Sequence, residues 1–188
     1  MLSIRPKWCE KIVNGEKTIE VRKTKPKLET PFKCYIYCTM DHPYISVSCG
    51  ELDKLNYRTN TVGRCNGKVI GEFTCDRIFP INIFDNGSIQ NWLFEHMERS
   101  CLTYEEIADY IGNGKTGHGW HISDLKIYDA PKDLNEFWLP PELYCEKERC
   151  GGCPYDQVAD VNGEYSFDCE WKRPLTRPPQ SWCYVEEG

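Results

Sequence analysis

The segment GEKTIEVR (residues 15–22) constrains the fold most strongly, because it changes from a turn to a strand pattern. A short helical pattern precedes it, and Gly15 suits the left-handed residue that ends a helix. Alternate residues of a strand share a face, so its two β-branched apolar residues are expected to enter a core, opposite Glu20 and Arg22. With Lys17 beside them at the turn, these charges predict a small polar recognition site. The alternative is an ion pair on a strand surface.

The rest of the chain alternates β-prone and helical patterns without regular strand–helix–strand repetition. Strand patterns occur at residues 2–4, 34–39, 68–78 with a break at Pro80, and 120–128; helical patterns begin at Pro6, at Ser88 and at Thr103, and residues 129–137 form a polar turn with a short helical piece. The chain has neither a P-loop nor a GxGxxG turn. We therefore expect an α+β fold, a small mixed β-barrel with flanking helices, rather than a doubly wound nucleotide-binding fold.

The size of the chain predicts one domain with an appendage. Its 188 residues include 13% aromatic residues, enough for a packed core. The pair Pro140-Pro141 is a boundary signal, which divides the chain into residues 1–139 and a Cys-rich segment with a tail at residues 140–188. No stretch approaches the roughly 18 apolar residues of a membrane helix, and the N-terminus lacks the apolar run of a signal peptide. We expect a cytoplasmic protein with no membrane partner.

The net charge of −6 argues against a general nucleic-acid coat. The charge is uneven: residues 1–33 carry nine Lys/Arg and four Asp/Glu, a net of +5, whereas the remaining residues carry 14 and 25, a net of −11. The basic segment contains the 15–22 motif. It could bind an anion or a nucleotide locally, or it could be a solvated basic face.

The cysteines near the C-terminus predict a metal site. The chain has twelve cysteines, and five of them follow Pro141. In Cys150-Gly151-Gly152-Cys153, the glycines allow both thiolates to point at one ion, and Cys145 and Cys169 are the nearest residues to complete a tetrahedral zinc site. Cys183 lies in an alternating strand-like run. We predict a structural zinc that stabilises this polar segment; reduced thiols or a redox pair are the alternatives.

Residues 1–137 resemble the ASCH domain, a PUA-like β-barrel family of RNA-associated proteins, in its small bacterial and phage type. Three stretches carry the resemblance: residues 2–6 with the motif at 15–22, which is similar to the family signature GxKxxExR; the strand-like run His121–Tyr128; and the tail Arg177–Trp182. The resemblance implies a PUA-like barrel with a cleft near the first helix.

The resemblance also implies which residues line that cleft. They are Lys17, Glu20 and Arg22 from the signature, Arg5 from the first strand, and His121 and Ser123 from the late strand. An aromatic ring, Trp8 or Trp120, would stack on a base. Such a site suits single-stranded RNA or a nucleotide, because the cations can bind phosphate and the carboxylate can accept from base amino groups.

Two other functions stay open at this stage. One is a hydrolase acting on RNA or a modified nucleoside, since some relatives are ribonucleases and one branch deacetylates N4-acetylcytidine with a lysine, a threonine three residues on and a glutamate. Lys17 matches the lysine, whereas Glu20 replaces the threonine and Ser100 falls near the glutamate; in an enzyme Lys17 and Glu20 would be catalytic. The other is a bacterial or phage regulatory adaptor that uses the acidic C-terminal half.

Overall fold

The computed structural model describes residues 1–45, 65–90, 94–140 and 174–187, and its described strands form two four-stranded sheets and a small two-stranded one. The first sheet has the order β1 (Leu2–Ile4), β3 (Phe32–Cys38), β4 (Val69–Cys75), β8 (Ser123–Lys132). The second has the order β2 (Ile19–Arg22), β7 (Thr116–His121), β5 (Ile78–Ile83), β6 (Ile89–Gln90). β9 (Phe137–Trp138) pairs with β10 (Glu186–Glu187).

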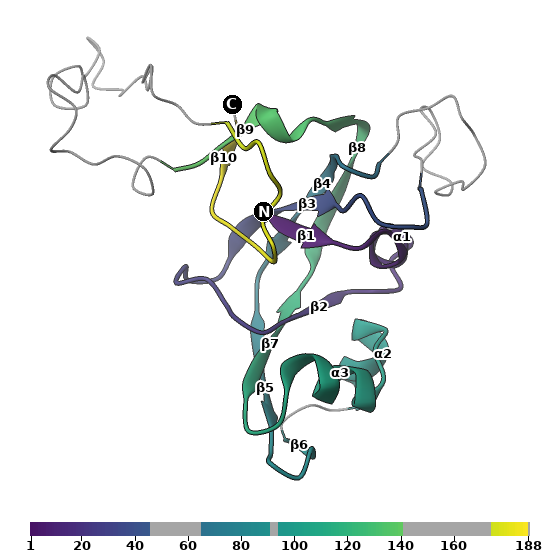
Figure 1. Cartoon of the computed structure of the whole chain (residues 1–188), viewed down its shortest axis with the longest axis vertical. Helices are drawn as coiled ribbons and strands as arrows, with labels where there is room; N and C mark the ends of the chain where they lie inside the picture. The colour runs from purple at the N-terminus through teal and green to yellow at the C-terminus, as the bar shows by residue number, and fades with distance from the viewer. Residues whose placement is uncertain (46–64, 91–93, 141–173, 188) are drawn as a thin grey trace, which may run out of the picture.

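The two large sheets continue into one another. Only Ile122 separates β7 from β8, and only Asp76 and Arg77 separate β4 from β5. Figure 1 shows these strand pairs running through the length of the molecule. β1 is parallel to β3, and the remaining pairs of both sheets are antiparallel. The predicted mixed α+β class is confirmed.

Three α-helices and one 3₁₀ turn (Leu134–Glu136) accompany the described strands. The α-helices are α1 (Pro6–Val13), α2 (Phe94–Ser100) and α3 (Tyr104–Ile111). Pro6 begins α1, as expected for a residue whose missing N–H is not needed there. The predicted capping box of α3 is confirmed, because the Thr103 side chain accepts from the Glu106 amide while Glu106 Oε2 accepts from the Thr103 amide.

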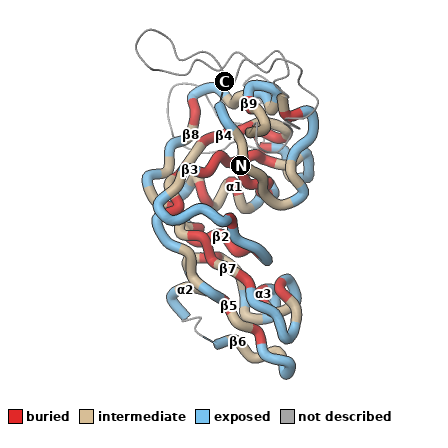
Figure 2. The backbone as a smooth tube through the Cα atoms, turned by 90° about the vertical axis from the view of Figure 1, so that its left-hand side faces the viewer, coloured by how far each residue is buried: buried red, intermediate tan, exposed pale blue. Residues whose placement is uncertain are grey.

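The apolar face of β2 enters the core as predicted. Ile19 and Val21 pack with Ile81, Ile107 and Ile111, which joins the second sheet to α3. A separate cluster fills the space between α1 and the first sheet around Leu2, Ile12, Ile36 and Phe73. Figure 2 shows the buried residues concentrated along the strands, with exposed residues on the loops and helix surfaces.

The prediction of one strand to residue 78 ending at Pro80 is wrong. The break falls at Asp76 and Arg77, and Pro80 lies inside β5, paired with His118. Among the described residues, β6 pairs only with Asn82 and Ile83 on the other side of β5. Pro80 is therefore at an edge position, where a residue without an N–H is tolerated.

The prediction of a helix from Ser88 is also wrong in its start. Gly87 has a φ of +81°, the Phe84 amide bonds to the Ser88 carbonyl, and Ile89 continues into β6. Asn86-Gly87 is a hairpin-turn signal that competes with the helical pattern. α2 begins only at Phe94.

The strand predicted at residues 120–128 also differs from the structure in its bounds. The run predicted at 120–128 is split by Ile122 between β7 and β8, and β8 continues to Lys132 through part of the predicted polar turn. Asp124 has a φ of +47°, and the pairing of β4 with β8 shifts register nearby. The bend lets one continuous stretch of chain contribute to both sheets.

The C-terminal strap, residues 174–187, packs back on the N-terminal strand. The Ser3 amide donates to the Ser181 carbonyl at 2.9 Å, and Cys183 exchanges hydrogen bonds with Met1. Leu175 is buried, and Cys183 is half-buried against the same cluster. The described part of the segment predicted at 140–188 thus contacts the body formed by residues 1–139. No helix in the described parts of the chain has the length and apolar character needed to cross a membrane.

Candidate functional site

A turn between α1 and β2 positions the charged motif. Gly15 adopts a φ of +73°, as predicted for the residue that follows the helix, and the amides of Glu16 and Lys17 bond back to the Lys11 carbonyl. The chain therefore turns tightly, and β2 begins two residues after Lys17.

Lys17, Glu20 and Arg22 form one buried ionic network. Lys17 Nζ lies 3.3 Å from Glu20 Oε2, and Arg22 NH2 lies 3.0 Å from Glu20 Oε1. All three side chains are buried. One carboxylate thus lies between two cations, and the network carries a net charge of +1 in a place that excludes most water.

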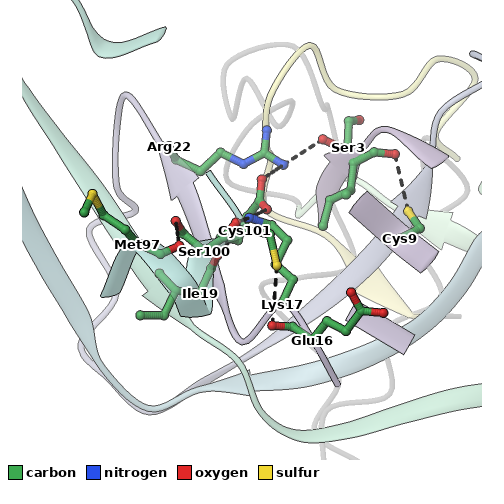
Figure 3. A network of polar contacts seen from close by, with 11 residues as sticks. Ser3, Cys9, Glu16, Lys17, Ile19, Arg22, Met97, Ser100 and Cys101 are labelled. Carbon is green, nitrogen blue, oxygen red and sulfur yellow. Dashed lines mark hydrogen bonds and ion pairs between the residues drawn. The ribbon is translucent and has the colours of Figure 1, made fainter. Parts of the chain in front are cut away.

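Lys17 also connects the motif to α2. Its Nζ donates to the Ser100 carbonyl at 2.5 Å and to the Ile19 carbonyl at 2.9 Å. Ser100 is the last residue of α2, so the ammonium lies at the negative end of the helix dipole. In Figure 3, Lys17 lies beside Ser100 and Cys101, and the Cys101 thiol donates to the Glu16 carbonyl.

Arg22 connects the motif to β1 and to the C-terminal strap. Its NH2 donates to the Ser3 carbonyl at 2.7 Å, a contact drawn in Figure 3, and its NH1 lies 3.5 Å from Ser181 Oγ. Four segments distant in sequence, namely β1, β2, the end of α2 and the strap, therefore meet at this network.

The network borders an open cavity of about 350 Å³. The lining residues come from β1 and α1, from the motif, from the end of β3, from α3 and from the strap: Ser3, Ile4, Arg5, Trp8, Lys17, Glu20, Val21, Arg22, Thr39, Leu102, Glu106, Tyr110 and Gln180. Three lining residues are cations and two are carboxylates, so the lining has a net charge of +1 in a protein of net charge −6.

Two aromatic rings belong to the lining, and both lie near cations. Lys7 Nζ lies 4.1 Å and Lys17 Nζ 5.2 Å from the centroid of the Trp8 ring, while Lys23 Nζ lies 5.1 Å from the centroid of the Tyr110 ring. A planar group that enters the cavity therefore meets aromatic surface with positive charge beside it.

Two buried polar atoms near the cavity have no hydrogen-bond partner among the described residues. They are Arg22 Nε and Thr39 Oγ1. Glu20 Oε2 accepts no hydrogen bond either, and its contact is the ion pair with Lys17. Unsatisfied buried polar groups cost free energy, so these atoms make the wall of the cavity locally less stable.

The structure brings together four of the predicted site residues. Arg5, Lys17, Glu20 and Arg22 all line the cavity. Arg5 Nε lies 3.8 Å from Asp41 Oδ2. Because the Arg5 side chain is 72% exposed, its guanidinium remains accessible to a ligand.

Trp120, His121 and Ser123 do not line this cavity. Trp120 is buried against Phe32, with a ring-centroid distance of 5.7 Å, even though it is the strand partner of Glu20. Ser123 Oγ donates to the Thr74 carbonyl at 2.9 Å. These two side chains take part in packing and in strand pairing.

His121 belongs to a second polar network, outside the cavity. Its Nδ1 lies 2.5 Å from Asp76 Oδ1 and its Nε2 lies 2.5 Å from Arg99 NH2. Because a guanidinium can only donate, Nε2 is the acceptor and Nδ1–H donates to Asp76. Arg99 Nε also donates to Thr18 Oγ1 at 3.0 Å. His121 therefore helps to hold α2 against β2 and β7.

Several lining residues were not predicted from the sequence. They are Thr39, Leu102, Glu106, Tyr110 and Gln180. The helix that carries Glu106 and Tyr110 was predicted, but its amphipathic pattern does not say which strand it faces. The tail around Gln180 resembles the tails of family members. No local pattern in its sequence predicts that it contacts β1.

The predicted zinc ligands Cys145, Cys150, Cys153 and Cys169 lie outside the described residues. In the part of the chain that the structure describes, no group of three or more His, Cys, Asp or Glu side chains is arranged to hold a metal. Cys34 and Cys75 are buried free thiols, and burial raises the pKa of each to about 12.

Fold and site together define a mixed α+β domain with a cavity lined by charged and aromatic residues. Residues 2–46 match the family model of the ASCH domain, which confirms the resemblance stated from the sequence. The matched segment contains β1, α1, β2 and β3, and with them Arg5, Lys17, Glu20 and Arg22.

Solved structures and curated proteins were compared as well. A crystal structure of ASCH from Zymomonas mobilis is 19% identical, with 71% of each chain covered and a TM-score of 0.46. A tyrosine-to-phenylalanine variant and a serine-to-alanine variant of that protein are 19% and 20% identical, cover 71% of this chain and 73% and 72% of theirs, and have the same TM-score of 0.46. The comparison with curated proteins found no match. The match to the family model covers residues 2–46.

Proposed function

We propose that this protein binds RNA or a nucleotide in the cavity bordered by Lys17, Glu20 and Arg22. The observation that carries the proposal is the buried carboxylate between two cations, in the wall of a 350 Å³ cavity that also contains aromatic rings. The match of residues 2–46 to a domain of an RNA-associated family supports the same class of ligand.

The size of the cavity favours one nucleotide unit as the occupant. Ligand pockets in proteins range from about 300 to 1,000 Å³, and this cavity lies at the lower end of that range. A longer RNA would therefore place one nucleotide in the cavity and the adjoining phosphates outside it. Arg5 and Lys7 are exposed beside the cavity and can bind those phosphates.

The lining offers complementary chemistry for each part of a nucleotide. The rings of Trp8 and Tyr110 offer stacking surface for a base. Glu20 Oε1 can accept from a base amino group, since its ion pair with Arg22 does not use all of its acceptor positions. The guanidinium of Arg5 can pair with a phosphate.

The hydrogen bonds of Lys17 favour binding over turnover. A lysine that acts as a base or nucleophile must lose a proton and present a lone pair. Lys17 Nζ already donates to the Ile19 and Ser100 carbonyls, and Glu20 Oε2 lies 3.3 Å away as its ion-pair partner. These contacts fix Nζ on protein groups, and the side chain is only 1% exposed, so the amine is not presented to a ligand as a base or nucleophile.

Replacing Arg5 tests the proposal with little risk to the fold, because the side chain is exposed. We expect Arg5→Gln to weaken binding of short single-stranded RNA and of nucleoside monophosphates about tenfold, as for the loss of one charge-assisted hydrogen bond. Arg77→Gln is the matched control, since Arg77 is exposed between β4 and β5 and does not line the cavity. Isothermal titration calorimetry gives the affinities.

Two results would contradict this proposal. One is equal weakening by Arg5→Gln and Arg77→Gln, which would indicate binding to general surface charge. The other is turnover by the wild type of RNA or of N4-acetylcytidine, measured in parallel by chromatography of the products, which would favour the hydrolase.

We further propose a structural zinc bound by Cys145, Cys150, Cys153 and Cys169, because four thiolates make a closed tetrahedral site. We expect one zinc per chain by atomic emission, and chelation should expose these four thiols to alkylation, mapped by mass spectrometry. Cys34 and Cys75 are internal references, since burial raises their pKa to about 12 and they should stay unlabelled in the folded protein. Substoichiometric zinc in freshly purified, reduced protein would contradict the proposal.

A further inference from the structure

The C-terminal strap is part of the wall of the cavity, although the motif lies some 160 residues earlier in the sequence. It runs antiparallel to β1, which is an edge strand of the first sheet. The Ser3 amide and the Cys183 amide donate across this edge to the Ser181 and Met1 carbonyls at 2.9 and 3.0 Å. The strap thus extends the sheet and is held by backbone hydrogen bonds.

The residues on both sides of Gln180 are fixed by residues that also build the site. Ser3 Oγ donates to the Pro179 carbonyl at 2.6 Å, and Arg22 NH1 lies 3.5 Å from Ser181 Oγ. Ser3 and Arg22 both line the cavity. The backbone around Gln180 is therefore positioned by residues of the cavity wall, and Gln180 itself is exposed and belongs to the cavity lining.

The chemistry of this side chain differs from that of the other lining residues. The other described lining residues offer charged groups, two aromatic rings, apolar side chains and hydroxyls. Among these hydroxyls, Ser3 Oγ already donates to the Pro179 carbonyl. A carboxamide both donates and accepts, so it can recognise the polar edge of a neutral base by its pattern of donors and acceptors. Cations bind the phosphate of any nucleotide, whereas a contact with the edge of the base distinguishes among nucleotides.

We propose that Gln180 determines base specificity, with its side-chain amide hydrogen-bonded to the edge of the base in the cavity. This inference rests on the proposed nucleotide binding. It gives the C-terminal strap a role in ligand recognition that its distance from the motif does not suggest.

The test compares the affinities of the four nucleoside 5′-monophosphates for the wild type and for Gln180→Leu, which keeps similar volume and removes the amide. We expect the ratio between the tightest and the weakest affinity to fall about tenfold in the variant, as for the loss of one base contact. Gln90→Leu is the matched control, because Gln90 is an exposed glutamine on β6 outside the cavity, and its ratio should equal that of the wild type.

A second measurement uses the wild type alone and so does not depend on the folding of a variant. In a ¹⁵N-labelled sample, the side-chain amide resonances of Gln180 should shift on titration with the tightest nucleotide, while those of Gln90 should not. Unshifted Gln180 resonances, an unchanged affinity ratio, or equal weakening for all four nucleotides would each overturn the specificity role. Nucleotide binding that Arg5→Gln weakens would then still support the proposed function, whereas a wild type that binds no nucleotide would overturn both.

Discussion

Two polar networks on the neighbouring strands β2 and β7 differ mainly in their burial. The network of Lys17, Glu20 and Arg22 on β2 has side-chain exposures of 1%, 9% and 8%. In the network centred on His121 of β7, His121 is 21% and Asp76 41% exposed. The first borders the cavity, and the second lies outside it.

The backbone explains how the buried charges are tolerated. Lys17 donates to the Ile19 and Ser100 carbonyls, and Arg22 donates to the Ser3 carbonyl, so that much of the lost hydration is replaced by fixed dipoles. The exposed network relies on side-chain contacts, and water remains available to its members. Burial raises the strength of each interaction and also the cost of leaving a group unpaired.

This contrast suggests what each network contributes. A buried ion pair is often no more stabilising than apolar residues of the same volume, whereas an exposed one contributes little in either direction. The buried network therefore needs a reason other than stability. The ligand cavity beside it is that reason in our proposal, and the His121 network has only to hold α2 on the sheet.

The largest expected effect comes from removing the central carboxylate. Glu20→Ala leaves two buried cations without their anion, and we expect a loss of about 3–5 kcal/mol in the free energy of unfolding. Asp76→Ala removes the carboxylate of the exposed network and should cost no more than about 1 kcal/mol. Urea denaturation monitored by tryptophan fluorescence measures both. Equal losses for the two variants would show that burial does not separate the networks.

The next effect separates stability from function in the buried network. The triple variant Lys17→Met, Glu20→Leu and Arg22→Met replaces all three charges by apolar side chains of similar size. We expect it to lie within about 2 kcal/mol of the wild type, because no unpaired charge remains, although three carbonyls lose their donors.

The same triple variant should lose nucleotide binding beyond detection by calorimetry. A triple variant less stable than Glu20→Ala would mean that the charges themselves stabilise the fold. Retained nucleotide binding in a folded triple variant would remove the network from the proposed site.

The local half of this site could be predicted from the sequence. The alternation along residues 19–22 depends only on strand geometry, and it correctly predicted that Ile19 and Val21 enter the core, although Val21 also borders the cavity with Glu20 and Arg22. The turn at Gly15 is equally local. Arg5 was placed in the cavity by resemblance to the family, and the structure brings it there.

The other half depends on packing between distant segments. Lys17 is bonded to a carbonyl 83 residues away, and Gln180 reaches the cavity only because the strap pairs with β1. Trp120 shows the reverse case: it is paired with Glu20 in the sheet, yet its large ring packs against Phe32 rather than lining the cavity. No periodicity in the sequence distinguishes these outcomes.

The smallest expected effect is the acid sensitivity of the exposed network. Partial burial acts to raise the pKa of Asp76, but the hydrogen bond from His121 and the positive charge of Arg77 outweigh it and lower that pKa below its ordinary value of 3.8. A carboxyl with a lowered pKa in the folded state stabilises the protein above the ordinary value, and this stabilisation is lost as the pH falls through the folded-state pKa. Stability should therefore fall below about pH 4.

Asp76→Asn isolates this contribution, since it removes the titrating carboxyl and keeps the shape of the side chain. We expect the variant to lose less stability than the wild type when urea denaturation is repeated between pH 6 and pH 3. Asp109→Asn is the matched control, because Asp109 is exposed on α3 away from this network. An identical pH profile for Asp76→Asn and the wild type would mean that the His121 contact does not lower the pKa of the carboxyl in solution. The stability contributions of the exposed and the buried network would then differ even more than their exposures suggest.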